Sequence, residues 1–471
     1  METVRPLTWF NVIGYGLGDV ANNFAFALGA LFLLHYYTDV AGLSAAAAGT
    51  LLVLVRIYDA FMDVIAGRVI DRTISRWGRF RPFLLWSALP LLLMSVAVFS
   101  VPANWTSAQK LVYAYVTYAI LGTAYSFVNI PYGSLATVMT QEPRERALLG
   151  AMRTLMATGT FAFLALAIAP KIRHAANPQE LQAHLTEFTL ILAVVGMALY
   201  CLCFKATREI VQREIERPGF KSSLNTLRYN RPLLMLCISA LCLHTGLFSQ
   251  TATALYFARY VLGDVSLFIP IIVISSFLSV LVAAPLTPLL VKCKGKKNTF
   301  LLGISIGALS YFLLFFAPTN IKFLPFILLG AASIGAMIAM SVMWALEADT
   351  VEFGEWVTGI RIEGMTYAIF SFSRKCGQAL GGSIPAFLLA ASGYMPNALT
   401  QSDATRLGIL GAIAFVPGVA FAIAFVLMYF YPLTDVRFAK LVQEIRDRQH
   451  PGYRAQLVSD KKTASSQTLP R

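Results

Sequence analysis

The chain has 471 residues, of which 57% are hydrophobic and only 13% are charged, and its mean hydropathy is +0.65. A soluble domain carries about 25% charged residues and could not cover so much apolar surface with so few. The composition therefore excludes an ordinary soluble protein and indicates that lipid surrounds most of the chain.

Long apolar runs recur along the whole chain, and a helix needs about 20 apolar residues to cross a bilayer. These runs predict twelve membrane-spanning helices, at 10–36, 45–67, 83–101, 110–134, 148–170, 184–204, 233–258, 266–290, 299–317, 323–346, 363–393 and 405–431. We therefore expect an all-α membrane protein. Because twelve is an even number, both termini are expected on the same side of the membrane.

The formal net charge of +14 would also suit a nucleic-acid-binding protein. Here the basic residues gather in short loops between the spans, at 68–81, 205–231 and 292–297, whereas the loop at 38–44 has none. That asymmetry is typical of the cytoplasmic loops of membrane proteins. We therefore expect no nucleic-acid partner and place both termini in the cytoplasm.

The longest polar stretch between spans, 205–231, divides the twelve helices six and six. A basic, glycine-containing loop follows both the second and the eighth span, which indicates a repeated six-helix unit. Two such bundles around a central cavity form the major-facilitator fold. The expected domains are an N-terminal bundle at 1–204, a cytoplasmic central loop at 205–231, a C-terminal bundle at 232–432 and a cytoplasmic tail at 433–471.

Several spans contain ionisable side chains, which are costly in hydrocarbon and therefore need a partner or a function. Arg56, Asp59 and Asp63 in the second span are three and four residues apart, so they share one helical face. One arginine neutralises at most one carboxylate, which leaves the other free to bind a proton or a metal cation. The alternative is a structural ion-pair network. We favour cation coupling and add Ser126 of the fourth span to this group.

Amide and aromatic side chains in the first and fourth spans suit a hydrophilic substrate. Asn22 and Asn23 lie near mid-membrane, and Tyr125 and Asn129 are four residues apart on one helical face. Amides bind sugar hydroxyls, and an aromatic ring covers the apolar face of a sugar. The alternative is hydrogen bonding and packing between helices, and for Asn22 both interpretations stay open. We predict substrate contact for Asn23, Tyr125 and Asn129.

Basic side chains also lie in the fifth and eleventh spans. Arg153 begins the fifth span, and Arg374 and Lys375 lie about 12 residues, roughly 18 Å, into the eleventh. Lys375 is expected to be either the counter-ion of a carboxylate in the second span or a contact for an anionic substrate. Arg153 and Lys375 are therefore added to the predicted substrate-binding residues. His244 in the seventh span is expected to be a hydrogen-bonded packing residue.

The remaining polar groups predict neither an enzyme nor a metal protein. No Ser/His/Asp set, phosphate-binding loop or metal-ligand pattern occurs, so no cofactor is expected. The six cysteines lie in spans or cytoplasmic loops, where thiols stay reduced, so no disulfide is expected. A group of charged residues in the loop before the eleventh span is interpreted as a cytoplasmic gate or a salt-bridge network: Asp349, Glu352, Glu355, Arg361 and Glu363.

Several motifs of the chain resemble those of the glycoside–pentoside–hexuronide:cation symporters. They are YYTDV at 36–40, RIYDAFMD at 56–63, RWGRFRP at 76–82 and EFGEW at 352–356. Within this family the resemblance is greatest to the glucuronide carriers, through GDVANNFAF at 18–26, WALEADT at 344–350 and FSRKCGQ at 372–378. The resemblance implies sugar–cation symport in a bacterial inner membrane, and no obligate protein partner.

The chain departs from the melibiose carriers of that family at three informative positions. Asp59 and Asp63 match carboxylates of their cation site, but Met62 replaces an asparagine. A soft thioether is a poor ligand for sodium, so we expect proton rather than sodium coupling. Two sugar-binding aspartates correspond to Asn23 and Asn129, which would not repel a substrate carboxylate. The resemblance thus implies import of glucuronides, with Arg153 and Lys375 supplying attraction.

Two other functions are kept as alternatives. The first is symport of neutral glycosides or pentosides, coupled to sodium or protons. The second is a membrane sensor or scaffold that uses a transporter-like fold, although the chain carries no recognisable signalling domain. Transport by the purified protein in liposomes separates the second alternative from the symporters.

Overall fold

The structure is a computed structural model that describes residues 7–73, 75–140, 142–209, 229–317, 321, 323–359 and 363–449. Within these ranges all regular secondary structure is helical. The helices of the first half are α1 (Trp9–His35), η1 (Tyr36–Val40), α2 (Ala45–Arg72), α3 (Phe83–Trp86), α4 (Ala88–Val98), α5 (Ser107–Met139), α6 (Pro143–His174) and α7 (Pro178–Ala206).

The second half contains longer helices and several short irregular turns. Its elements are α9 (Arg231–Tyr256), η2 (Phe257–Val261), η3 (Val265–Leu267), α10 (Phe268–Ile272), η4 (Val273–Leu278), α11 (Ser279–Phe316), α12 (Leu324–Thr358), α13 (Glu363–Ala391), α14 (Asp403–Leu410), η5 (Gly411–Phe415), α15 (Val416–Tyr429) and α16 (Asp435–Gln449).

The helices match the twelve predicted spans. In the described residues, nine helical segments are long and apolar enough to cross a membrane, and one of these, Val265–Phe316, holds two crossings. The backbone breaks there at Gly295, whose φ of +78° is accessible to glycine. The short apolar helix Phe83–Val98 and α13 complete the set. α13 is less apolar because Arg374 and Lys375 lie inside it.

Local sequence explains where many helices begin. The side chains of Thr8, Ser44, Thr106, Asn177 and Asn230 each accept a hydrogen bond from the backbone N–H three residues later. These residues satisfy N–H groups that the first helical turn leaves free. These caps therefore fix where the five helices begin.

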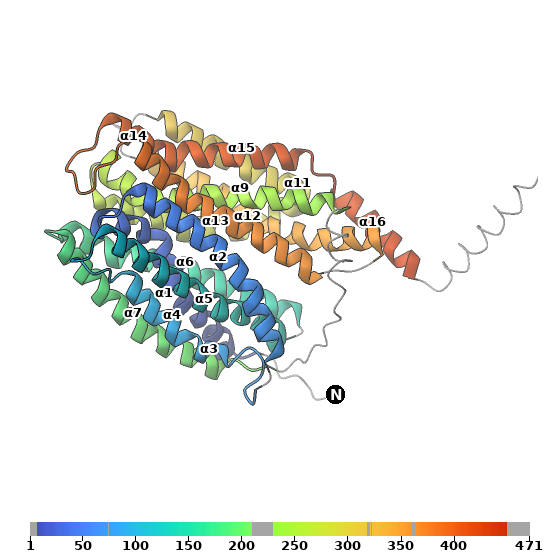
Figure 1. Cartoon of the computed structure of the whole chain (residues 1–471). Coiled ribbons are helices and arrows are strands. Elements are labelled where there is room, and N and C mark those ends of the chain that lie inside the picture. The colour runs from blue at the N-terminus through green and yellow to red at the C-terminus, as the bar shows by residue number, and fades with distance from the viewer. Residues whose placement is uncertain are drawn as a thin grey trace, which may run out of the picture.

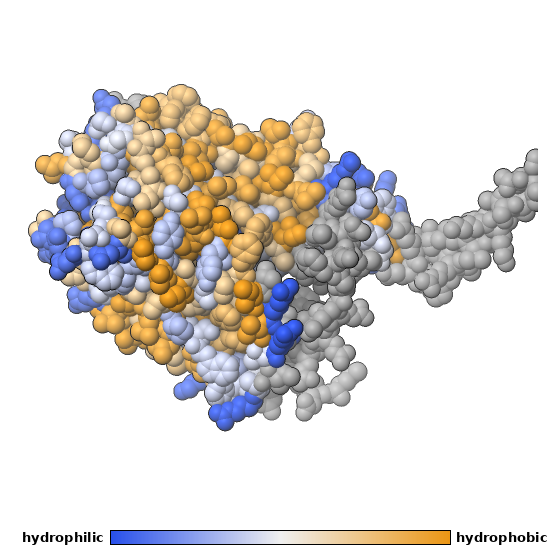
Figure 2. Space-filling model, in the orientation of Figure 1, coloured by the Kyte–Doolittle hydropathy of each residue, from blue (hydrophilic) through white to orange (hydrophobic). Residues whose placement is uncertain are grey.

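The surface of the bundle has the polarity of a membrane protein. Figure 2 shows hydrophobic residues over the middle of the molecule and hydrophilic residues gathered toward its two ends. Large apolar side chains such as Phe61, Val194 and Ile327 are 65–68% exposed, which is costly in water and favourable in acyl chains. The lipid contact expected from the composition follows from this surface.

The two halves of the chain lie side by side (Figure 1), and each is packed mainly within itself. In the first half α1 packs against α6 and α7, and α5 against α2 and α4. In the second half α9 packs against α13 and α15, and α11 against α12 and α15. The main contacts between the halves are those of α2 with α13, of α1 with α9, and of α6 with η3, α10 and η4.

One prediction about the polar segments near the end of the chain was wrong. Asp349, Glu352 and Glu355 lie in α12, which continues to Thr358, and not in a loop. Arg361 and the side chain of Glu363 lie outside the described residues. The segment predicted as the tail begins with α16, which packs against α12. Its Glu444 Oε2 accepts a hydrogen bond of 2.7 Å from Trp356 Nε1.

Close contact between α11 and α12 depends on glycine. A Cβ atom added at Gly335 would lie 2.4 Å from the carbonyl oxygen of Gly303, where neither backbone can yield easily. We predict that Gly335→Ala lowers the stability of the folded protein by about 1–3 kcal/mol, as over-packed cores do. Thermal unfolding of the purified protein in detergent measures this effect.

The matched control is Gly150→Ala on α6, because a Cβ atom there meets nothing within 4 Å. This control should leave the unfolding temperature unchanged or raise it slightly, since alanine favours the helix. Equal unfolding temperatures for the two variants would contradict the close packing of α11 on α12.

Candidate functional site

The predicted site residues come from both halves of the chain. They lie on α1, α2, α5 and α6 of the first half and on α13 of the second, and α13 packs directly on α2. Each lies in the interior of its helix, well away from the ends. The structure therefore places the predicted residues around the contact between the halves, which any rocking motion of the halves must remodel.

Asp63 of α2 is paired with residues from two other helices. Lys375 Nζ of α13 contacts Asp63 Oδ2 as an ion pair, and Ser126 Oγ of α5 donates a hydrogen bond of 2.6 Å to Asp63 Oδ1. The lysine thus joins the second half to the first at mid-helix. Of the two roles that the sequence left open for Lys375, the counter-ion role is the one seen here.

Asp59, one turn earlier on α2, is much less well satisfied. Its Oδ2 lies 3.9 Å from Arg56 Nη1, and its side chain is only 9% exposed. Asp59 Oδ1 is buried and has no hydrogen-bond partner among the described residues. Gly122 of α5 leaves the space that Asp59 Oδ1 occupies, because a Cβ atom added there would overlap that oxygen. A buried carboxylate oxygen without a donor favours the protonated acid.

The polar residues of α1, α5 and α6 form a second group. Arg153 Nε donates a hydrogen bond of 3.0 Å to Asp19 Oδ1, and Arg153 Nη2 lies 3.5 Å from Asn129 Oδ1. Asn23 Nδ2 donates to the carbonyl oxygen of Asp19 at 2.8 Å and lies 3.3 Å from its Oδ2. Asn23, Asn129 and Arg153 are therefore brought together, with Asp19 as the residue that links them.

Asp19 was not among the predicted site residues. It is buried, and its carboxylate neutralises Arg153 across the boundary between α1 and α6. Only its position inside a span could have signalled this, because nothing in the sequence relates residue 19 to residue 153. Asn22, whose role was left open, accepts a hydrogen bond of 2.7 Å from Tyr200 and so ties α1 to α7.

Aromatic rings lie between the two groups. Tyr125 stacks on Phe26 with a centroid distance of 5.6 Å, and Phe26 in turn meets Phe248 of α9 at 5.9 Å. The guanidinium of Arg56 lies 5.5 Å from the centre of the Phe26 ring. The aromatic rings of α1, α5 and α9 thus lie in contact with one another and beside Arg56 of α2.

A further basic residue belongs to this region, although sequence reasoning did not select it. Arg374 of α13 lies 4.6 Å from the centre of the Trp344 ring on α12 and donates to His244 of α9. His244 was expected to be a hydrogen-bonded packing residue, and it is buried with Nδ1 2.8 Å from the carbonyl oxygen of Ala240. The signal available in the sequence was the pair of adjacent basic residues inside one span.

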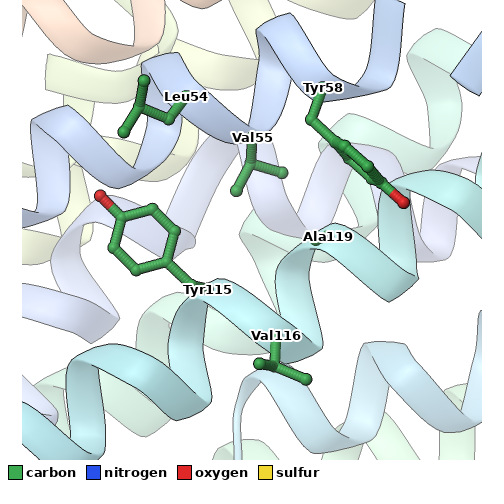
Figure 3. Close-up of a pocket in the computed structure, with 6 residues that line it drawn as sticks. All are labelled: Leu54, Val55, Tyr58, Tyr115, Val116 and Ala119. Atoms are coloured by element: carbon green, nitrogen blue, oxygen red, sulfur yellow. The ribbon is translucent and has the colours of Figure 1, made fainter. Parts of the chain in front are cut away.

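The hollows on the outer surface are a different kind of feature. One lies between α2 and α5 and is lined by the residues drawn in Figure 3: Leu54, Val55, Tyr58, Tyr115, Val116 and Ala119. Its lining is almost wholly apolar, and several of these side chains are exposed on the lipid-facing surface. Such a groove suits acyl chains and offers little to a hydrophilic substrate.

Comparison with known proteins identifies the class of molecule. Residues 14–435 match the family model described as MFS/sugar transport protein. The glucuronide carrier protein homolog of Escherichia coli K12 is 52% identical over 97% of this chain and 99% of its own length. An uncharacterised symporter of Bacillus subtilis 168 is 35% identical over 95% of this chain and 97% of its own length.

The chain belongs to the MFS sugar transport family. It is thus a multi-pass membrane transporter and not an enzyme. Among solved structures, a bacterial homologue of the human drug peptide transporters PepT1 and PepT2 superimposes with a TM-score of 0.64 at 14% identity, over 93% of this chain and 99% of that one. That similarity shows the fold alone, and it confirms the predicted major-facilitator architecture.

One end of this MFS sugar transporter is closed by a polar network between its halves. The network lies at the end where α1 finishes and α13 finishes, which we call the distal end. Tyr394 donates a hydrogen bond of 2.7 Å to Asp39 Oδ1, and Asn397 Nδ2 donates one of 2.7 Å to the carbonyl oxygen of Asp39. Thr38 and Tyr256 share a bond of 2.8 Å. The transporter is therefore closed at its distal end.

We predict that Tyr394→Phe shifts the transporter toward a state that is open at the distal end. A hydrogen bond to a charged group contributes about 1.5–3 kcal/mol, so the ratio of open to closed states should rise about tenfold or more. Spin labels at Trp105 and Leu399, which are both exposed at this end, report the separation of the halves by electron–electron double resonance.

Tyr113→Phe is the matched control. Tyr113 also lies near the distal end, but it donates its hydrogen bond of 3.0 Å to Ala97 within the same half. The distance distribution of this control should equal that of the unmodified transporter. If Tyr394→Phe gave the same distribution as well, the network would not be what holds the halves together.

Proposed function

We propose that this transporter imports glucuronides, the glycosides of a sugar acid, together with protons. Its membership of the sugar transport family and its 52% identity to a glucuronide carrier protein homolog support the substrate class. The single observation that carries the coupling is the arrangement on α2, where Asp63 is fully paired and Asp59 Oδ1 is buried without a donor.

The coupling ion follows from what each carboxylate can accept. Asp63 already has an ammonium group and a hydroxyl on its two oxygens. Asp59 has one distant guanidinium and one empty oxygen, which a proton satisfies without further ligands. A sodium ion needs several oxygen ligands, and the neighbouring Met62 offers only a thioether. These points favour Asp59 as the proton carrier.

The sugar is assigned to the amide and aromatic group. Asn23, Asn129 and Arg153 present hydrogen-bonding atoms from three helices, and Tyr125 presents a ring to the apolar face of a pyranose. Because Asp19 neutralises Arg153, this group as a whole carries no excess charge. It can therefore hold sugar hydroxyls without repelling a negatively charged neighbour.

The proposed cycle is alternating access about this central site. Protonation of Asp59 removes its attraction for Arg56 and frees that guanidinium to rearrange. The sugar then binds between α1, α5, α6 and α13, and the halves rock so that the distal end opens or closes. The ion pair between Lys375 and Asp63 joins the two halves. It must therefore break or rearrange when the halves move between the two access states.

Sidedness follows from the basic loops. The positive-inside pattern places both termini in the cytoplasm of a bacterium, so the distal end would face outward. With that orientation the structure is closed to the outside. Import then requires that Asp59 accept its proton while the distal end is open.

A second candidate is symport of neutral glycosides. One observation favours it, because Arg153 and Lys375, the residues expected to attract a sugar carboxylate, are both already paired with aspartates. If no other cation faced the site, a neutral sugar would fit as well as an acidic one. The two candidates differ in the substrate they accept, which uptake measures directly.

We predict that proteoliposomes take up 4-nitrophenyl β-D-glucuronide faster than 4-nitrophenyl β-D-glucoside. An inward proton gradient should drive accumulation, and an inward sodium gradient without a pH difference should not. Varying the two gradients independently separates the ions. Faster uptake of the glucoside would favour the second candidate, and accumulation driven by sodium alone would refute proton coupling.

We also predict that Asp59→Asn abolishes proton-driven accumulation but preserves exchange of labelled for unlabelled sugar. An amide cannot carry the proton, whereas it still fits beside Gly122. The matched control is Asp264→Asn at the distal end, where the side chain caps the backbone of Ser266 and the amide oxygen can do the same. Full accumulation by Asp59→Asn would exclude Asp59 as the coupling group.

A further inference from the structure

Four basic side chains lie around the proposed site, and they differ in how they are neutralised. Arg153 is paired with Asp19, Lys375 with Asp63, and Arg56 lies near Asp59. Arg374 has no carboxylate within 4.0 Å among the described residues. Each of the other three cations therefore has an aspartate within reach, whereas Arg374 has none.

Arg374 is held in place by uncharged groups. Its guanidinium lies over the Trp344 ring at 4.6 Å, and its Nε donates a hydrogen bond of 3.3 Å to His244 Nε2. His244 Nδ1 lies 2.8 Å from the carbonyl oxygen of Ala240, so it carries the ring proton and leaves Nε2 as an acceptor. The histidine in this arrangement is neutral and does not cancel the charge of Arg374.

This arrangement leaves the two terminal nitrogens of the Arg374 guanidinium able to bind a ligand. Nε is used by His244, and no hydrogen bond from either terminal nitrogen occurs within the described part of the chain. The two terminal N–H groups form the fork that binds a carboxylate through two parallel hydrogen bonds. The flat contact with Trp344 sets the plane of that fork before any ligand arrives.

Backbone packing fixes the position of this group. A Cβ atom at Gly377 would lie 2.3 Å from the carbonyl oxygen of Leu241, and one at Gly381 would lie 2.5 Å from that of Thr245. These two glycines let α13 approach α9 closely, as small residues do between membrane helices. The close approach brings Arg374 within reach of His244.

Aromatic contacts connect this part of α13 with the first half of the chain. A Cβ atom at Gly381 would lie 2.7 Å from Phe248 Cβ, the Phe248 ring meets Phe26 of α1 at 5.9 Å, and Phe26 stacks on Tyr125 of α5. The guanidinium therefore belongs to the helix that packs beside the aromatic group assigned to the sugar. A pyranose on this aromatic group would have one edge toward Asn129 and another toward Arg374.

We propose that Arg374, oriented by Trp344 and His244, is the specificity-determining residue that binds the carboxylate of an anionic sugar. This inference rests on the proposed function and deepens it, because it identifies which cation recognises the acid group. Arg153, paired with Asp19, then faces the sugar hydroxyls, and Lys375, paired with Asp63, forms the contact between the halves. The positive charge of Arg374 is neutralised when the substrate anion binds.

The test compares equilibrium binding of 4-nitrophenyl β-D-glucuronide and 4-nitrophenyl β-D-glucoside to the purified transporter. Arg374→Gln should weaken glucuronide binding about 10- to 100-fold and change glucoside binding less than about twofold, because only the acid uses the charge. Arg374→Lys should fall in between, since it keeps the charge but loses the planar fork and the stacking on Trp344.

Arg259→Gln provides the matched control. Arg259 also lies over a ring, 5.1 Å from the centre of Tyr260, but it is at the distal end of the α9–η2 segment. It is 15 residues, or about 22 Å, along the helix from His244. This variant should leave both binding constants unchanged. Thermal unfolding of each variant checks that it is folded.

The outcomes separate the inference from the function on which it rests. If the unmodified transporter binds the glucoside and not the glucuronide, the proposed substrate is wrong. If it prefers the glucuronide and folded Arg374→Gln keeps that preference, or loses both ligands equally, the role of Arg374 is overturned while the function stands. Should Arg374→Gln fail to fold, Arg374→Lys decides, because unchanged selectivity in that variant contradicts recognition by the fork.

Discussion

The cost of holding charge inside a membrane governs the rest of this structure. An ionisable side chain in hydrocarbon is tolerated only when a partner or a polar cavity compensates for its lost hydration. Here Asp19 compensates Arg153, and Lys375 compensates Asp63. Because the partners come from different helices, the charges also determine which helices must lie together.

The same constraint connects binding with motion. The contact between Lys375 and Asp63 joins α13 to α2 across the two halves, so it cannot persist unchanged when the halves rock. At the distal end, Asp39 accepts hydrogen bonds from Tyr394 and Asn397 of the other half. Aspartates of the first half thus contact donors of the second half at two places, Asp63 at mid-helix and Asp39 at the distal end. Movement of the halves during transport would break one of these contacts while the other remains.

Much of the fold could be predicted from the sequence, because hydrophobic length and loop charge are local properties. All twelve crossings were found, and the residues of α2 were correctly placed on one face. The wrong assignment also has a local cause. Asp349 and Glu355 were assigned to a loop because they are charged, yet α12 continues to Thr358.

The site itself was only partly predictable. Depth along a helix can be counted from the sequence, but the direction in which one helix faces another cannot. Asn23, Asn129 and Lys375 were selected by depth and by family resemblance, whereas Asp19 and Arg374 acquire their roles from neighbours more than 100 residues away, Arg153 and His244. Only the packed structure shows that Arg153 is already neutralised and that Arg374 is not.

The guanidinium of Arg374, which has no carboxylate partner among the described residues, is the group proposed to bind an anionic sugar. An experimental structure of the transporter with 4-nitrophenyl β-D-glucuronide bound tests this most directly. We expect the sugar carboxylate on the terminal nitrogens of Arg374, the hydroxyls toward Asn129 and the ring over Tyr125. A carboxylate placed on Lys375 or Arg153 instead, with their aspartates displaced, would contradict it.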